Sequence, residues 1–282
     1  MFWQTTRYRI DLSAPQIMGI VNVTPDSFSD GGRHAQAHAA LAHCERLLKD
    51  GAHILDIGGE STRPGSPPVP LEEELARVLP VLRGALTLGV PISLDSYKPG
   101  VMQVALDLGV DILNDIWALR QQGAVDLVAR HPCCGVCLLH MHRDPQTMQA
   151  APMEGDVLPQ VRGFLAEAVQ SLRVRGVAPE RIVLDAGIGF GKTVEQNFAL
   201  LARQNELLEL GYPWLAGWSR KSSLGAVTDL AIAAERVVPS AVAALLAVER
   251  GAAIVRVHDV RETTQALQVL EAVRAQEIKG KQ

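Results

Sequence analysis

The sequence is poor in aromatic residues and in cysteine, and both shortages narrow the class of protein. Aromatic residues make up 4% of the 282 residues, although apolar residues together reach 48%. The core must therefore be largely aliphatic, which suits many similar helices packed on a parallel sheet. The four cysteines are too few for a disulfide scaffold, and a chain of this length does not need one.

Long apolar runs and a strong net charge are also missing. The longest apolar run covers eight residues, 241–248, whereas a membrane span needs about 20. No apolar segment preceded by basic residues marks a signal peptide at the start. The formal charge of −4, from 27 basic and 31 acidic side chains, gives no reason to expect nucleic-acid or membrane binding. We expect a cytoplasmic protein whose partners are small molecules.

Short aliphatic segments recur along the chain, and each is followed by a helical pattern. Glycines such as Gly51, Gly109 and Gly251 stand where these helices should end. Eight such repeats favour an α/β fold, a (β/α)8 TIM barrel, as a single domain over residues 1–282 with its core at about 15–275. An open, doubly wound sheet of five to seven strands is the alternative. The predicted strands are 17–21, 53–57, 92–94, 111–113, 135–139, 182–184, 214–216 and 253–257.

Polar side chains follow the predicted strands, and in a barrel they would meet on the rim where barrel enzymes do their chemistry. Asp95, Asn114 and Asp185 offer acceptors that can pair with the N–H groups of a planar, amino-bearing heterocycle. Lys221 can donate to a carbonyl or nitrogen of the same ring. Taken singly, each residue has an ordinary structural explanation, such as a loop cap or an ion pair.

Other side chains on this rim suit an anion and a metal ion. Arg63, Arg256 and His258 can hold an anionic group, for which phosphate is the natural candidate. Asn22 offers a neutral oxygen to Mg²⁺, which favours few protein ligands together with phosphate oxygens.

Two further motifs favour structural interpretations. The segment 186–193 nearly fits a phosphate-binding P-loop, but Ala186 replaces its first glycine, so we prefer a glycine-rich turn with Thr193 as a helix cap. The segment 133–137 contains a Cys-x-x-Cys spacing without the second pair that a zinc site requires. Buried thiols entering a strand explain it better than redox chemistry does.

Four segments together resemble the dihydropteroate synthase family. Residues 20–32 and 55–65 look like its first and second signatures, and 219–222 and 256–260 match its late motifs in the right order. The first two are long and specific. The resemblance implies a (β/α)8 barrel, usually a homodimer, that joins 6-hydroxymethyl-7,8-dihydropterin diphosphate to 4-aminobenzoate with Mg²⁺ and releases diphosphate.

The resemblance also implies a role for individual residues. The pterin would bind to Asp95, Asn114, Asp185 and Lys221. The diphosphate would bind to Thr62, Arg63, Arg256 and His258. The aminobenzoate pocket would contain Phe28, Pro64, Phe190 and Ser222, and Mg²⁺ would bind Asn22. The catalytic residues would be Asp95, Asp185, Lys221 and Arg256.

The expected mechanism is displacement of diphosphate with much SN1 character, in which buried carboxylates stabilise the developing cation. Two alternatives share the barrel and the pterin pocket: a corrinoid-dependent methyltransferase and a non-catalytic pterin-binding paralogue. The Ser-Thr-Arg-Pro segment at 61–64 and the Arg-x-His at 256–258 argue against the first. The retention of Asn22 and Arg63 argues against the second.

Overall fold

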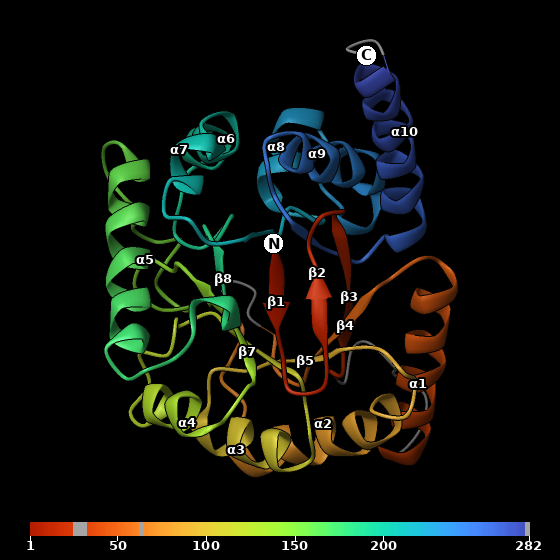
Figure 1. Cartoon of the computed structure of the whole chain (residues 1–282), viewed down its shortest axis with the longest axis vertical. Coiled ribbons are helices and arrows are strands. Elements are labelled where there is room, and N and C mark those ends of the chain that lie inside the picture. Colours follow the sequence, from red (N-terminus) through yellow and green to blue (C-terminus); the bar gives the residue numbers. More distant parts are fainter. Residues whose placement is uncertain (25–32, 62–64, 280–282) are drawn as a thin grey trace.

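The computed structural model describes residues 1–24, 33–61 and 65–279. Eight parallel strands close into a barrel in the order β10-β3-β4-β5-β6-β7-β8-β9, and helices surround it (Figure 1). This confirms the predicted TIM barrel and shows that the open, doubly wound alternative is wrong. The barrel strands are β3 (Gln16–Asn22), β4 (Ile54–Gly58), β5 (Ile92–Asp95), β6 (Ile112–Asp115), β7 (Gly135–Leu139), β8 (Ile182–Asp185), β9 (Trp214–Ala216) and β10 (Ile254–Val257).

The helices follow the strands as the sequence predicts. Gly51, Gly109 and Gly251 have positive φ angles between 94° and 108°, as expected of glycines that end helices. In the described part of the chain, no helix has the length and apolar character needed to cross a membrane. The helices are α1 (Arg33–Lys49), α2 (Leu71–Ala85), α3 (Pro99–Asp107), α4 (Ala124–Arg130), α5 (Val157–Arg173), α6 (Val194–Ala202), α7 (Gln204–Leu208), α8 (Ser222–Thr228), α9 (Val237–Glu249) and α10 (Val260–Lys279), with short 3-10 helices η2 (Pro179–Arg181) and η3 (Ala233–Glu235).

Alternation along the strands separates an apolar floor inside the barrel from a polar mouth. Successive side chains on a strand point to opposite faces, so residues two apart lie above one another on the same face. One buried cluster lines the lower interior and contains Met18, Ile54, Ile112, Cys137, Val183, Leu215 and Ile254. Two positions further along these strands stand Ile20, Asp56, Asn114, Leu139, Asp185, Gly217 and Arg256. The same strands that bury the floor therefore carry polar groups at the mouth.

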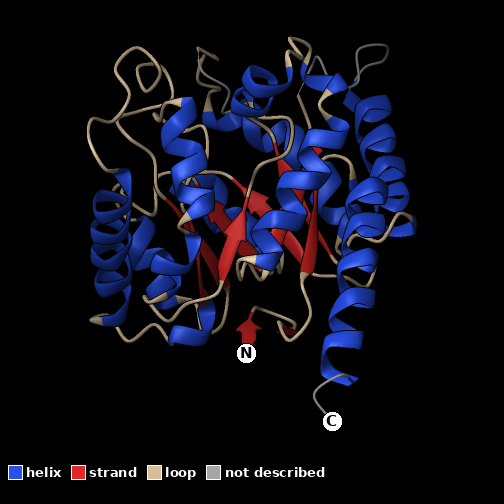
Figure 2. Ribbon diagram, turned by 90° about the horizontal axis from the view of Figure 1, so that it is seen from above, coloured by secondary structure: helices blue, strands red, loops and turns tan. Residues whose placement is uncertain are grey.

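An N-terminal hairpin that the sequence analysis did not predict closes the floor. Its strands, β1 (Phe2–Gln4) and β2 (Arg9–Asp11), pair antiparallel and lie below the barrel strands in Figure 2, at the end opposite the loops that follow them. Trp3 is fully buried in the same cluster as the floor residues, and its indole Nε1 donates to the carbonyl of Arg181 at 3.0 Å. The mouth is thus the end of the barrel that the hairpin leaves open.

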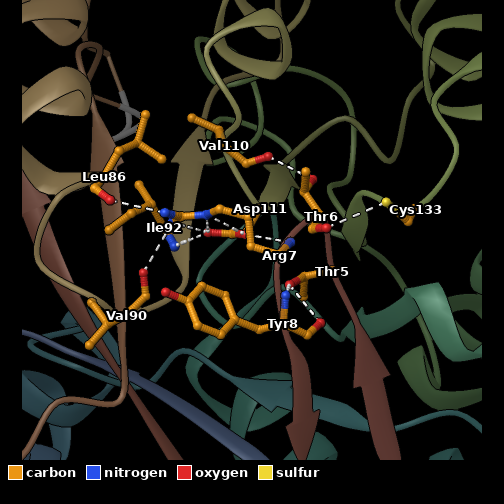
Figure 3. Close-up of polar contacts among 10 residues, drawn as sticks. All are labelled: Thr5, Thr6, Arg7, Tyr8, Leu86, Val90, Ile92, Val110, Asp111 and Cys133. Carbon is orange, nitrogen blue, oxygen red and sulfur yellow. Dashed lines mark hydrogen bonds and ion pairs between the residues drawn. The ribbon is translucent and has the colours of Figure 1, made fainter.

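An ion pair fastens the hairpin turn to the barrel (Figure 3). Arg7 donates from Nε and Nη2 to the carboxylate of Asp111, with a shortest distance of 2.6 Å, and its other donors reach the carbonyls of Leu86 and Val90. Asp111 is fully buried and also accepts from the backbone N–H of Ile92 at 2.9 Å. Removing this carboxylate would leave several donors without their acceptor.

We expect Asp111→Asn to lower the free energy of unfolding by about 2–4 kcal/mol, because one half of a buried, hydrogen-bonded ion pair is lost. Urea titration followed by circular dichroism measures this. The matched control is Arg203→Ala, which removes an exposed pair with Asp156 and should cost less than about 1 kcal/mol. Equal losses in the two variants would contradict the anchoring role.

Candidate functional site

The centre of the mouth is an arginine shared between two carboxylates. Arg256, on β10, donates from Nε to Asp56 Oδ2 at 2.6 Å and from Nη2 to Asp95 Oδ2 at 2.5 Å. Asp56 Oδ2 also accepts from Asn114 Nδ2 at 3.2 Å. Strands β4, β5, β6 and β10 are thereby linked through one charged network, because their inward positions meet inside the barrel.

Burial shifts the pKa values of the groups in this network. Burial raises the pKa of Asp95 to about 7, and the guanidinium of Arg256 limits that rise. Although burial disfavours the charge of Arg256, the carboxylates of Asp56 and Asp95 raise its pKa above the ordinary value. Arg256 is therefore a permanent cation, while Asp95 changes its charge near neutral pH.

Asp185 and Lys221 stand at the opposite side of the network. Asp185 Oδ1 accepts from the backbone N–H of Gly187 at 2.7 Å, and burial raises the pKa of this carboxyl. The ammonium of Lys221 lies over the ring of Phe190, 4.3 Å from its centroid. Burial lowers the pKa of Lys221 to about 8, and Asp185 opposes that shift.

Several polar atoms at the mouth form no hydrogen bond with the described part of the chain. Asn114 Oδ1 is buried without a partner, and the second oxygens of Asp95 and Asp185 accept from none of the described residues. Lys221 Nζ has a cation–π contact but no hydrogen bond there. Buried polar groups are normally paired. Three acceptors and one donor at the mouth therefore match a heterocycle that carries several N–H groups and a ring carbonyl or nitrogen.

The structure also places the remaining predicted ligands. His258 Nδ1 lies 3.0 Å from Ser219 Oγ, which fixes the ring at the end of β10. Asn22 ends β3 and is half-buried; its backbone pairs with Gly58 of β4, and its side chain forms no hydrogen bond with the described residues. Phe190 is buried, whereas Ser222 is exposed at the start of α8.

Four predicted site residues lie outside the described residues: Phe28, Thr62, Arg63 and Pro64. The second loop connects β4 to α2, and the structure does describe its residues on both sides of 62–64. Glu60 accepts from the backbone N–H of Val69 at 3.1 Å and from Tyr97 Oη at 2.9 Å, and it pairs with Lys98. Lys98 also pairs with Glu74, which is buried. Glu74, in the acidic first turn of α2, therefore helps to hold Lys98 beside the second loop, in addition to any interaction with the helix dipole.

Asp56 is a site residue to which the sequence analysis assigned no role. It is fully buried, bridges Arg256 and Asn114, and leaves Oδ1 without a partner. The sequence analysis counted residues 53–57 among the aliphatic segments, which hid this carboxylate. The signal that could have found it is alternation, since Asp56 is two positions after the inward-facing Ile54.

The two motifs with structural interpretations behave as expected. Thr193 caps α6 in a reciprocal capping box with Gln196. The P-loop alternative is wrong, because Lys192 is buried and its ammonium is directed at backbone carbonyls. Cys134 and Cys137 are buried free thiols.

Comparison with known proteins agrees with this geometry. A family model described as "Pterin binding enzyme" matches residues 18–258. A dihydropteroate synthase of Neisseria meningitidis serogroup B is 53% identical over 276 residues, which cover 96% of this chain and 97% of the relative. The chain belongs to the dihydropteroate synthase family. Its members are transferases, and this chain is an enzyme of that class.

Two solved structures of the family share the whole fold with this chain. The Burkholderia cenocepacia dihydropteroate synthase complexed with 7,8-dihydropteroate has a TM-score of 0.90 at 50% identity, covering 99% of this chain and 98% of that one. The Xanthomonas albilineans dihydropteroate synthase with 4-aminobenzoic acid also has a TM-score of 0.90, at 46% identity, covering 98% and 99%. The barrel and its mouth are therefore common to family members that hold product and substrate.

We expect the Asp95 carboxyl to titrate near pH 7 and the Arg256→Met substitution to move its pKa upward, because the opposing cation is lost. Carbon-13 NMR of labelled aspartate carboxyls measures the titration, and Asp95→Asn identifies the resonance. The exposed Asp156 carboxyl, whose pKa is lowered by hydrogen bonds, is the internal reference. An Asp95 resonance that titrates near pH 4 would contradict this electrostatic picture.

Proposed function

We propose that this chain condenses 6-hydroxymethyl-7,8-dihydropterin diphosphate with 4-aminobenzoate, giving 7,8-dihydropteroate, diphosphate and a proton. The observation that carries the proposal is a set of polar atoms at the mouth that form no hydrogen bond within the described part of the chain. Asp95, Asn114 and Asp185 offer open acceptors, and Lys221 offers a donor. An aminopyrimidine ring fused to a second nitrogen heterocycle presents the complementary groups. A similar family member has been solved with 7,8-dihydropteroate.

The carboxylates also suit the chemistry at the pterin methylene. The C–O bond to diphosphate breaks, and the developing positive charge delocalises into the electron-rich ring. Asp95 and Asp185 stabilise that charge at short range in a site partly closed to water. The aromatic amine then forms the new C–N bond and loses a proton. Because this amine is neutral and nucleophilic at neutral pH, the reaction needs no strong general base.

The leaving group requires positive charge on the other side of the mouth. Arg256 and His258, with Thr62 and Arg63 from the second loop, would bind the diphosphate. Asn22 fits a Mg²⁺ ion, since a half-buried amide oxygen that accepts from none of the described residues is a suitable neutral ligand. The ion would neutralise diphosphate charge when bound. Phe28 and Pro64, with Phe190 and Ser222, would form the aminobenzoate pocket.

A diphosphate-release assay with the purified chain tests the function and separates the alternatives. Release that depends on both the pterin diphosphate and 4-aminobenzoate, with formation of dihydropteroate, is the expected result. Pterin binding without release would favour a non-catalytic paralogue. Methyl transfer from a methylated pterin to a corrinoid would favour the methyltransferase.

We expect Asp185→Asn to raise the KM for the pterin diphosphate about tenfold or more, because a charge-assisted acceptor is worth about 1.5–3 kcal/mol. Steady-state kinetics measures this change. Asp126→Asn alters an exposed carboxylate on α4 and should leave the constants unchanged. Wild-type constants in the Asp185 variant would refute its role in pterin binding.

We also propose that the chain forms a homodimer through the outer face of α8 and α9. Val227, Ile232, Val238 and Val242 are 51–72% exposed over these neighbouring elements. Large exposed apolar side chains gathered on neighbouring elements are typical of interfaces between subunits. The buried side of α9, which includes Ala244 and Ala247, packs against the barrel, so the opposite side remains available to a second copy.

Val242→Asp should therefore convert the dimer to a monomer, because the substitution buries an unpaired charge at the contact. Sedimentation velocity measures the mass. Val174→Asp changes an even more exposed valine after α5 and should leave the mass unchanged. A monomeric wild type, or a dimeric Val242→Asp variant, would place the contact elsewhere or exclude it.

A further inference from the structure

Lys192 is a buried lysine whose ammonium contacts no described carboxylate. The residue is only 3% exposed. Nζ donates to the carbonyls of Gly187 at 2.9 Å and Phe190 at 3.2 Å, and it lies 2.9 Å from His140 Nδ1. Burying a cation is costly unless nearby groups compensate. The compensation here comes from backbone carbonyls and an imidazole.

These contacts join two neighbouring elements of the barrel mouth. Gly187 and Phe190 belong to the turn between β8 and α6, while His140 directly follows β7. The backbones approach closely, since a Cβ on Gly187 would lie 1.8 Å from the carbonyl oxygen of His140. Lys192 Nζ is also 3.4 Å from that same oxygen. The ammonium therefore sits among carbonyl dipoles that would repel one another without it.

The turn that Lys192 holds carries two groups of the proposed site. It begins directly after Asp185, and the N–H of Gly187 donates to Asp185 Oδ1 at 2.7 Å. It also contains Phe190, whose ring lies under the ammonium of Lys221. A displacement of the turn would shift the pterin carboxylate and the aromatic ring together.

We propose that Lys192 is a positioning residue, which fixes the turn after β8 to the end of β7 and so orients Asp185 and Phe190 toward the substrates. The assignment of Asp185 and Phe190 to substrates rests on the function proposed above. Burial lowers the pKa of His140 to about 2, so its imidazole is neutral and Nδ1 accepts from the ammonium. Burial also lowers the pKa of Lys192 to about 7, while the charge of Asp185 opposes the loss of its proton.

The first test needs no substrate. Hydrogen–deuterium exchange of the ligand-free protein should show faster exchange over residues 186–193 in Lys192→Met than in the wild type. Lys192→Gln keeps two amide donors for the carbonyls and should lie between them, and it carries the test if the Met variant does not fold. Asp126→Asn changes an exposed carboxylate on α4, which pairs with Arg175, and should leave exchange in the turn unchanged.

The second test uses kinetics. Lys192→Met should raise the KM for both the pterin diphosphate and 4-aminobenzoate about tenfold, with a smaller change in kcat, because orientation of the pockets is lost and no reacting group is removed. Asp126→Asn should leave both KM values unchanged. This split separates positioning from a general loss of stability.

The outcomes distinguish the two proposals. Wild-type exchange in both Lys192 variants, or faster exchange with unchanged KM values, would overturn the positioning role. Faster exchange in a protein whose wild type releases no diphosphate would keep the anchored turn and refute the proposed function instead.

Discussion

The mouth of this barrel depends on the pairing of Arg256 with Asp56 and Asp95. An unpaired guanidinium inside a barrel would be very costly, and so would two buried carboxylates without a cation. The shared pairing solves both problems with one network and fixes β4, β5 and β10 relative to one another. It also leaves Asp56 Oδ1 and Asn114 Oδ1 without a hydrogen-bond partner among the described residues. The buried charges are therefore compensated in the folded protein, and acceptor oxygens remain available to a ligand.

The electrostatic properties of the mouth follow from the position of this charged network above the apolar floor of the barrel. The floor cluster, which includes Ile54 and Cys137, excludes water from below. The low polarity beneath the charges is what raises the pKa of Asp95 and lowers that of Lys221. A carboxyl and an amine that titrate within reach of neutral pH result from ordinary barrel geometry.

The sequence predicted the features that repeat and missed those that depend on long-range contacts. Eight aliphatic segments were sufficient for the barrel, and strand ends were sufficient to find Asp95, Asn114 and Asp185. Asp56 was missed because it lies within an aliphatic strand. The spacing around Lys192 resembles a P-loop, but spacing does not report the direction of a side chain. The hairpin strands, with three residues each, are too short to have a recognisable period, and contacts with distant Arg181 and Asp111 stabilise them.

The buried hairpin has a consequence for how the chain is made. Its residues are translated before the carbonyl that receives the indole of Trp3, which is 178 positions further along the chain. The hairpin therefore cannot form this contact until the segment around Arg181 has been synthesised. Contacts of such large sequence separation slow folding, because loop closure must precede any gain from packing. A segment that is translated early is therefore among the last to reach its final place.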